Sequence, residues 1–217
     1  MINLYEASSI KINNPIIIDI GCNIGYESKK LFDIFNPKLL ISVDPFEYNI
    51  EKTKELIGFN YERWIVDCCA IDNEDDEKLA SLNISHCTNN SPCGFLLQEG
   101  EKYKDIVKVK TKKIETIHKT PDILKIDIEG YEFIIWEQLI NIKSVKIIFL
   151  EIHGGTHYTN YEDKVRIIKE LEKSFNTRYF TLNQSQNLNN DYSQELKSSP
   201  FNGCDGNYFN MLLERKK

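Results

Sequence analysis

The sequence predicts an α/β fold built around a doubly wound, mostly parallel β-sheet with helices on both faces. Two observations support this prediction. First, an apolar, β-branched run at 16–20 leads directly into a turn with glycines at positions 21 and 25, and a helical segment follows. A continuous apolar run of this kind is typical of a strand that is buried on both faces. Second, strand-like and helix-like segments alternate along the chain, which is the pattern of a parallel sheet.

The glycine turn after the first strand is the segment from which we interpret the rest of the chain. Glycine lets the backbone turn sharply and lets a ligand approach without a Cβ atom in the way. In doubly wound sheets, ligands bind outside the carboxyl ends of the strands. Taken alone, Gly21 and Gly25 are equally compatible with an ordinary strand-to-helix turn that needs glycine for geometry only.

The elements follow in order along the first part of the chain. Pro15 precedes the first strand, a position at which proline is tolerated. The pattern then predicts a helix at 27–35, a strand at 39–44, a helix at 47–57 that ends at Gly58, and a strand at 63–69. The less regular middle predicts an acidic turn at 72–77, a strand at 79–86, a loop at 87–100, a short strand at 106–110 and a helical turn at 112–118.

Regular alternation returns in the second part of the chain. It predicts a strand at 122–128, a helix at 131–142 with Phe133, Trp136 and Ile140 on its core face, a strand at 145–153 and a helix at 161–175. Strands at 178–182 and 208–213 are expected to close the sheet as an antiparallel pair. We expect the 217 residues to form one domain, with a lead-in segment at 1–14 and variable loops at 87–100 and 183–205.

Composition narrows the function classes. The formal net charge of −6 disfavours a general nucleic-acid-binding role, because phosphate binding needs a basic face. The first residues lack the basic and apolar regions of a signal peptide, and no apolar run approaches the length of a membrane span. The six cysteines form no CxxC pair, and Cys87 and Cys93 are expected to be free thiols rather than a metal or disulfide pair. These features predict a cytoplasmic protein with reduced thiols.

Three of the predicted strands end in acids, namely Asp19, Asp44 and Asp127. Asp44 lies about twenty residues beyond the glycine turn, the spacing expected for a carboxylate that binds ribose hydroxyls. The turn reads Gly-x-x-x-Gly rather than Gly-x-Gly-x-x-Gly, and the chain has no P-loop lysine, so a pyrophosphate ligand fits poorly. S-adenosylmethionine carries ribose and adenine without phosphate and is the predicted cofactor. An NAD-dependent oxidoreductase on the same architecture is the alternative.

Three stretches together resemble the FkbM-type methyltransferases, which belong to the class I methyltransferases. They are Asp19-x-Gly21-x-Asn23-x-Gly25, then Asp44-Pro45, and the more specific block Asp122-Ile-Leu-Lys-Ile-Asp127-Ile-Glu129-Gly-Tyr-Glu132. The resemblance runs from about Pro15 to His153. It implies a seven-stranded Rossmann-like sheet with an antiparallel last strand, and O-methylation of a sugar or a glycosylated small molecule. The chain departs from the family pattern at Cys22 (usually Ala), at Asp44 (usually Glu) and at 112–115, where an acidic pair is common.

The resemblance also implies a role for each matching residue. Asp19, Gly21, Asn23 and Gly25 would shape the methionine end of the site, with Tyr26 covering the ligand. Asp44, followed by Pro45, would hold the ribose. Cys69 and Ala70 would border the adenine, with Asp67 as a weaker candidate, and Asp127 would lie near the transferred methyl group.

A sugar hydroxyl is a poor nucleophile, so we expect a base to remove its proton during the attack. Asp127 is the first candidate, His153 the second and Glu129 the third. Asp127 and Glu129 are two residues apart, so on a regular strand both would point the same way, although Glu129 is at the turn. His153 lies at the end of the next predicted strand. Glu132 is expected to serve as an acid at a helix N-terminus. Alternatively, Asp127, Glu129 and Glu151 bind a magnesium-type ion that activates the acceptor in place of a base.

The sequence is compatible with two further functions. One is a binding module that keeps the fold and the cofactor but methylates nothing. The other is a nucleic-acid methyltransferase, which the acidic balance disfavours; Asp44-Pro45-Phe46 also lacks the second proline of an amino-group methylation motif and follows the wrong strand. The acceptor is expected to be a small molecule bound between the loops at 87–100 and 183–205.

Overall fold

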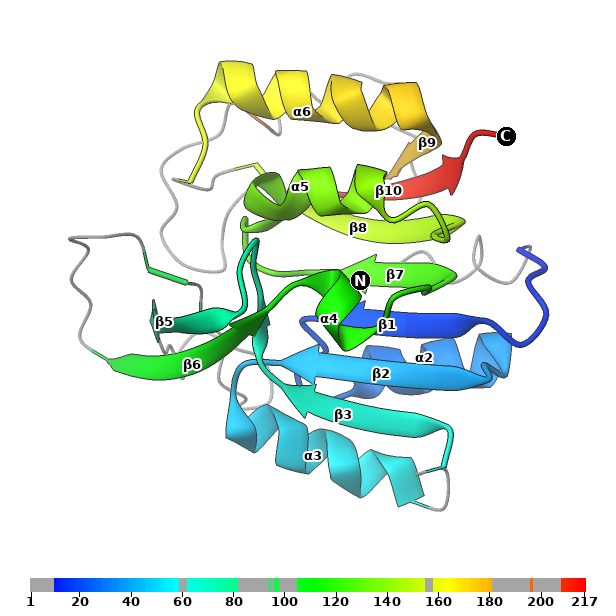
Figure 1. Cartoon of the computed structure of the whole chain (residues 1–217), viewed down its shortest axis with the longest axis vertical. Coiled ribbons are helices and arrows are strands. Elements are labelled where there is room, and N and C mark those ends of the chain that lie inside the picture. The colour runs from blue at the N-terminus through cyan, green and yellow to red at the C-terminus, as the bar shows by residue number, and fades with distance from the viewer. Residues whose placement is uncertain are drawn as a thin grey trace.

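The computed structural model describes residues 10–58, 62–81, 94, 96–97, 105–154, 158–180, 196 and 208–217. Within these residues the chain forms a seven-stranded sheet in the order β3-β2-β1-β7-β8-β10-β9 (Figure 1). Strand β10 runs antiparallel to both of its neighbours, and the central pairs are parallel. The expected doubly wound, mostly parallel seven-stranded sheet with an antiparallel last strand is confirmed.

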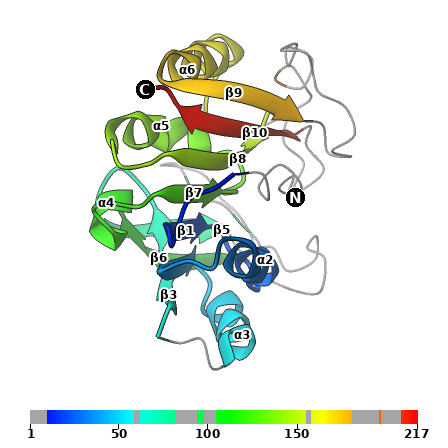
Figure 2. The same cartoon turned by 90° about the vertical axis from the view of Figure 1, so that its right-hand side faces the viewer.

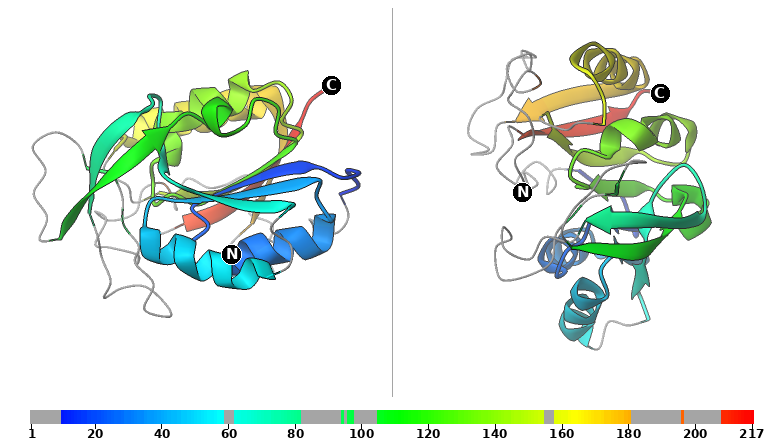
Figure 3. Two further views of the ribbon diagram at one scale, coloured as in Figure 1. Left: turned by 60° about the horizontal axis from the view of Figure 1, so that its bottom comes forward. Right: turned by 90° about the vertical axis from the view of Figure 1, so that its left-hand side faces the viewer.

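The seven strands are Ile16–Ile20 (β1), Leu39–Asp44 (β2), Trp64–Cys68 (β3), Ile123–Ile126 (β7), Ile147–His153 (β8), Phe175–Phe180 (β9) and Tyr208–Arg215 (β10). The helices are Tyr26–Phe35 (α2), Glu47–Ile57 (α3), Ile114–Ile117 (α4), Glu132–Asn141 (α5) and Tyr161–Ser174 (α6). Helices α2 and α3 cover one face of the sheet, and α4, α5 and α6 cover the other (Figures 2 and 3). No helix among the described residues is both long and apolar enough to cross a membrane.

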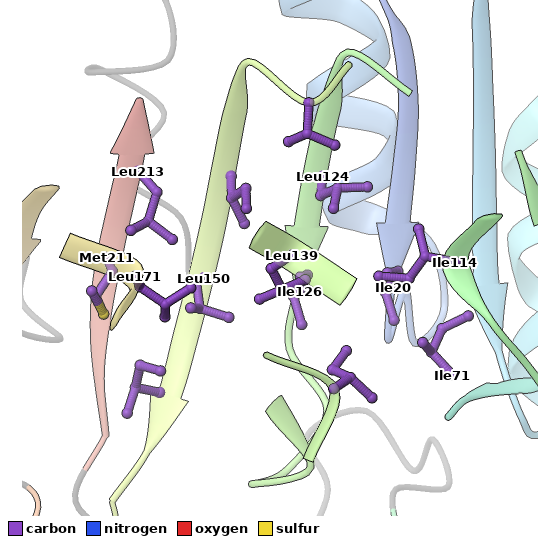
Figure 4. Close-up of a cluster of buried hydrophobic side chains, with 14 of the residues drawn as sticks. Ile20, Ile71, Ile114, Leu124, Ile126, Leu139, Leu150, Leu171, Met211 and Leu213 are labelled. Atoms are coloured by element: carbon purple, nitrogen blue, oxygen red, sulfur yellow. The ribbon is translucent and has the colours of Figure 1, made fainter. Parts of the chain in front are cut away.

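The larger core lies between the sheet and helices α4 to α6 (Figure 4). Side chains from the central strands, such as Ile20, Leu124 and Leu150, meet Leu139 of α5 and Leu171 of α6 there. Buried residues of α2, together with Ile57 of α3, pack on the opposite face. Because both faces of the central strands are covered, their near-continuous apolar sequences are explained.

A second, three-stranded sheet was not predicted. It has the order β4-β6-β5, with strands Ala70–Ile71 (β4), Asp76–Ser81 (β5) and Ile106–Lys112 (β6). Figure 1 shows β5 and β6 beside the ends at which β1, β2 and β3 terminate. The prediction of an acidic turn at 72–77 is therefore wrong for its last two residues. Asp76 and Glu77 belong to strand β5 and pair with Thr111 and Lys110 of β6.

Other boundaries differ by a few residues. Phe175 was predicted to end a helix but begins β9, where it is 1% exposed and pairs with Arg215. Burial in the sheet core outweighs its place in the helical pattern. The strand expected at 79–86 is observed as Asp76–Ser81, and positions 82–86 lie outside the described residues. The loops expected at 87–100 and 183–205 also lie outside them, apart from 94, 96–97 and 196.

Candidate active site

The turn between β1 and α2 folds tightly because of its left-handed residues. Gly21, Asn23 and Gly25 have φ angles of 75°, 49° and 83°. A Cβ atom on Gly21 would lie 1.8 Å from the carbonyl oxygen of Asp127, and one on Gly25 would lie 2.8 Å from Thr53. Both glycines are therefore required by close packing as well as by conformation. The turn lies directly against the end of β7.

The side chain of Asp44 is fixed at the end of β2, beside this turn. Its Oδ2 atom accepts a hydrogen bond of 3.0 Å from the backbone N–H of Asn23. Its Oδ1 atom accepts hydrogen bonds from the N–H of Phe46 and from Nδ2 of Asn49, both at 3.0 Å. Burial raises the pKa of Asp44 to about 7, although these three donors lower it. The carboxylate is therefore held in one orientation before any ligand binds.

Asp19 lies below the turn and is fully buried. It accepts a hydrogen bond of 2.5 Å from the Ser28 hydroxyl, and its other oxygen lies 3.2 Å from the ammonium of Lys125. Lys125 also donates to the carbonyl oxygen of Gly21 at 2.8 Å. Burial raises the pKa of Asp19, and Lys125 opposes that shift. Asp19 thus shapes the turn through Lys125 and does not line the pocket described next.

One pocket opens at the carboxyl ends of the central strands. Its walls join the glycine turn, the end of β2, the segment after β3, the small sheet and the end of β7. They consist of Ile20, Gly21, Asn23, Asp44, Pro45, Phe46, Cys69, Ala70, Ile71, Ala80, Gly94, Leu96, Asp127, Ile128, Glu129 and Tyr131. The structure therefore brings together seven of the ten predicted cofactor positions, Asp127 included.

Three other predicted residues lie away from the pocket walls. Tyr26, the first residue of α2, is 56% exposed. Gly25 packs on Thr53 of α3. Asp67 forms an ion pair with Lys112 at 2.7 Å, which directs its carboxylate toward the small sheet. None of these three side-chain positions contributes to the pocket wall as the structure describes it.

A cluster of acids surrounds His153 at the ends of β7 and β8. The Nε2 atom of His153 lies 3.6 Å from a carboxylate oxygen of Glu129, 3.8 Å from one of Asp127 and 3.9 Å from one of Glu151. Asp127 and Glu129 also line the pocket, so the cluster forms part of its wall. Glu129 has a φ angle of 55°, a conformation that non-glycine residues rarely adopt and that is common at functional sites. All three predicted base candidates are thus brought together.

Glu132 holds His153 from the opposite side. Its Oε1 atom accepts hydrogen bonds from the backbone N–H of His153 and from Nδ1 of its ring, both at 2.8 Å. Its Oε2 atom accepts a hydrogen bond of 2.8 Å from the N–H of Gly130. The sequence predicted Glu132 as an acid at a helix N-terminus. In the structure it is 2% exposed and its carboxylate also binds His153 and Gly130.

Charge is distributed unevenly within this cluster. Burial disfavours a charged imidazole, but Glu132 first and then Glu129 and Asp127 raise the pKa of His153 to about 10. Burial raises the pKa of Glu129 to about 7, against the opposing charge of His153. Burial alone would raise the pKa of Asp127, but Lys125 and His153 hold it below its usual value. Near neutral pH the ring is thus an imidazolium and Asp127 a carboxylate.

The metal alternative meets a changed set of residues. In the structure, one possible ligand atom each of Asp127, Glu151 and His153 lies within 4.8 Å of the others. The sequence predicted Glu129 as the third ligand in place of His153. Carboxylates suit hard cations, but an imidazole must be neutral to bind a metal. The magnesium alternative stays a prediction.

Several residues of the site were missed by the sequence analysis. Phe46 directly follows Asp44-Pro45 and could have been added from its position. Tyr131 lines the pocket, donates to Asp72 at 3.0 Å and meets the ring of Tyr158 edge-on at 5.0 Å. Tyr131 stands inside the family-like block, but its place in the pocket wall depends on contacts with Asp72 and Tyr158, which only the folded structure shows. Lys125 stands inside the family-like block, but only the folded structure shows its partners.

The model of the methyltransferase FkbM domain matches residues 19–179. The chain belongs to the FkbM methyltransferase family. That family assignment implies S-adenosylmethionine as the methyl donor and leaves the oxidoreductase alternative without support. A search of curated proteins found no match.

Solved structures agree on the fold. Methyltransferase FkbM from Methylobacillus flagellatus KT superimposes with a TM-score of 0.55 at 13% identity over 96% of this chain and 46% of that one. This chain therefore spans about half the length of that protein. An rRNA methylase from Streptococcus thermophilus gives 0.52 at 10% identity, covering 97% and 92% of the two chains. A Streptococcus mutans protein in complex with SAH (S-adenosylhomocysteine) gives 0.51 at 12% identity, covering 96% and 93%. At identities this low, the superpositions show a shared Rossmann-like methyltransferase fold.

Proposed function

We propose that this protein is an S-adenosylmethionine-dependent O-methyltransferase that acts on a hydroxyl group of a sugar or a glycosylated small molecule. The observation that carries the proposal is that the acids at the end of β7, Asp127 and Glu129, line the same pocket as Asp44 and the glycine turn. A hydroxyl bound in that pocket has carboxylates beside it that can orient it and accept its proton.

The pocket residues fit the cofactor. The Gly21 position leaves no room for a Cβ atom, so the backbone of the turn forms the wall for the methionine end. Asp44 presents a fixed, buried carboxylate for the ribose hydroxyls, and Phe46, Ile71 and Leu96 supply apolar surface for the adenine next to Cys69. When bound, S-adenosylmethionine supplies a methyl group on a sulfonium, which the acceptor oxygen attacks as the carbon–sulfur bond breaks.

The protein must then supply alignment and a proton acceptor. We assign the proton to Glu129, because its pKa of about 7 suits a base that works near neutral pH. Asp127, which remains ionised between Lys125 and His153, orients the hydroxyl by accepting a hydrogen bond. His153 already carries its proton, so it is not the base in this scheme.

The acceptor class rests on chemistry and on family resemblance. Neighbouring hydroxyl groups of a sugar can donate to the carboxylates of Asp127 and Glu129 at once. The chain's net charge of −6 disfavours a polyanionic acceptor such as RNA, although structural neighbours include rRNA methylases.

A thermal-shift titration with S-adenosylhomocysteine and, separately, NAD tests the cofactor. A ligand that binds only the folded protein raises its melting temperature, so S-adenosylhomocysteine should shift the transition and NAD should not. A shift with NAD alone would contradict the proposal. Sugars and glycosides are then screened as acceptors by the release of S-adenosylhomocysteine.

The base assignment is tested with Glu129→Gln and Asp127→Asn once an acceptor is known. Removal of a general base lowers turnover by about 10²–10⁴-fold, and we expect that loss in Glu129→Gln with S-adenosylhomocysteine affinity nearly unchanged. Asp127→Asn should lose turnover as well, and its pH profile should move to lower pH, because the charge of Asp127 raises the pKa of Glu129. Glu137→Gln, an exposed acid of α5, is the control. Full turnover in Glu129→Gln would remove Glu129 from the mechanism.

A further inference from the structure

A second cavity, of about 530 Å³, lies away from the candidate active site. Its walls come from two segments, residues 113–120 around α4 and residues 138–144 at the end of α5 and in the turn before β8. These segments directly precede β7 and β8, so the cavity lies at the amino ends of those strands. Among the described residues it shares no wall position with the pocket at the carboxyl ends.

Gln138 holds the two walls of this cavity together. Its Oε1 atom accepts a hydrogen bond of 2.9 Å from the N–H of Ile114. Its Nε2 atom donates to the carbonyl oxygen of Asp72 at 2.8 Å and to Oδ1 of Asn73 at 3.0 Å. The end of α5 is thereby fixed to the start of α4 and to the turn after β4. The walls therefore keep their spacing before any ligand binds, which lowers the ordering cost of binding.

Positive charge gathers on these walls. Lys113, Lys119 and Lys143 line the cavity, and Glu115 is the only acid among its described lining residues. Lys143 donates to the carbonyl oxygen of Ile140 at 3.1 Å. The side chains of Lys113 and Lys119 form no hydrogen bond or ion pair within the part of the chain that the structure describes. The basic wall includes part of the stretch 112–115, where an acidic pair is common in the family.

Other acids near these segments are bound by other groups. Asp122 lies 2.7 Å from the ammonium of Lys146. The carboxylate of Asp75 accepts hydrogen bonds from the backbone N–H of Lys113 at 2.7 Å and from the Thr116 hydroxyl at 2.9 Å. Neither acid lines the cavity. The lysines of the wall thus outnumber the acids that face them, which favours a negatively charged ligand.

A buried hydroxyl group belongs to the same wall. The Oγ atom of Ser144 is buried and has no hydrogen-bond partner among the described residues. A buried polar group without a partner is unfavourable, so a ligand oxygen that accepts the hydroxyl proton would bind favourably. Ile142, which is also buried, adds apolar surface. The cavity therefore offers charged, neutral polar and apolar contacts together.

We propose that this cavity is a second ligand site, which binds the phosphate groups of a small molecule through Lys113, Lys119 and Lys143. Lysine ammonium groups bind phosphate oxygens as compact point charges. The volume of about 530 Å³ is within the range of small-molecule pockets and leaves room for an organic part beside the phosphate. The site does not depend on the proposed function, since it has no wall residue in common with the cofactor pocket among the described residues.

Calorimetric titration with pyrophosphate and, separately, with glucose 6-phosphate tests the site. Pyrophosphate should bind about tenfold more weakly in each of Lys113→Gln and Lys119→Gln, because each variant removes a charge-assisted hydrogen bond. Glu115→Gln should bind it more tightly, because this variant removes the one negative charge of the wall. Lys29→Gln, the same change as in the lysine variants at an exposed position of α2, should bind as the unmodified protein does.

Backbone ¹H–¹⁵N chemical shifts locate the bound anion. Pyrophosphate should move the signals of Lys143 and Ser144 and leave that of Gly21, in the other pocket, in place. Tighter binding of glucose 6-phosphate than of pyrophosphate would identify a phosphorylated metabolite as the ligand, and the reverse order would identify an inorganic polyphosphate. Both results support a phosphate site.

Three results would overturn the proposal. They are no binding of either probe, equal affinities in the two cavity lysine variants and in Lys29→Gln, and binding of single-stranded RNA through these lysines without binding of either small phosphate. The fate of the proposed function is separate. A protein that ignores S-adenosylhomocysteine but binds pyrophosphate in this cavity loses the methyltransferase proposal and keeps the second site.

Discussion

The two sides of the pocket are built by different interactions. On the cofactor side, formed by the glycine turn and the end of β2, Asp44 receives three hydrogen bonds of 3.0 Å from protein donors. On the acceptor side, formed by the ends of β7 and β8, Asp127, Glu129 and Glu151 face His153 at 3.6–3.9 Å, beyond hydrogen-bond distance. On the first side the carboxylate that faces the pocket is itself fixed by hydrogen bonds, whereas on the second side Glu132 fixes His153 at 2.8 Å and the carboxylates of the pocket wall lie at ion-pair distance from that ring.

The difference matches what each side has to do. A cofactor site recognises one ligand, so geometry that is complete before binding reduces the ordering cost of association. A proton-transfer site must change its hydrogen bonds during the reaction, and such contacts are often long before the substrate binds. Lys125 joins the two sides, since it contacts the Gly21 carbonyl at 2.8 Å and lies 3.7 Å from Asp127.

The largest effect should come from breaking the rigid side with Gly21→Ala. The new Cβ atom would lie 1.8 Å from the backbone oxygen of Asp127, and the φ angle of 75° is unfavourable for alanine. We expect the free energy of unfolding to fall by at least about 5 kcal/mol and S-adenosylhomocysteine binding to disappear. Urea denaturation and calorimetric titration measure the two effects.

Gly58→Ala is the matched control for this variant. Gly58 also has a positive φ angle, 54°, but among the described residues, its chain neighbours aside, no atom lies within 4 Å of the Cβ position. It therefore measures the conformational cost alone, roughly 1 kcal/mol, with cofactor binding kept. Equal losses in the two variants would show that the contact with β7 is unimportant.

Lys125→Met tests the link between the two sides. Removal of one partner leaves Asp19 buried without its cation, and breaking a buried pair costs roughly 3–5 kcal/mol. Lys146→Met, which breaks an exposed pair with Asp122, should cost less than about 1 kcal/mol. Thermal and urea unfolding compare them. A similar small loss in both would mean that the buried lysine does not join the turn to β7.

The sequence predicted the parts of the molecule that depend on local pattern. The apolar run at 16–20, the helix at 47–57 and the strand at 39–44 were correct because burial on both faces and capping leave local signals. The glycine turn, Asp44 and Asp127 were also located, since spacing along parallel strands places their ends at one edge.

What the sequence did not predict depends on contacts between distant segments. Glu132 and His153 are 21 residues apart, and the local sequence around each of them does not indicate that the two side chains are in contact. The small sheet pairs β5 with β6 across a long intervening segment, and its strand residues Asp76 and Glu77 look like a turn. The family-like block contains Lys125, but its function as a buried cation follows from Asp19 on a neighbouring strand.

The smallest predicted effect concerns pH on the cofactor side. The pKa of Asp44 is raised by burial to about 7, above its value in the unfolded chain, so the carboxyl group is neutral below that pH and ionised above it. The ionised form accepts hydrogen bonds from ribose hydroxyls, so S-adenosylhomocysteine affinity should rise about tenfold between pH 6 and pH 8, the change in ionised fraction for that pKa. Calorimetric titration across this range measures it. Asp44→Asn should bind weakly and without this slope, while Glu129→Gln should keep it, because Glu129 also titrates near pH 7 but lies on the acceptor side. A slope that vanishes in Glu129→Gln instead would place the pH sensitivity of cofactor binding among the acids of β7, and the contrast between a rigid cofactor side and a charge-held acceptor side would fail.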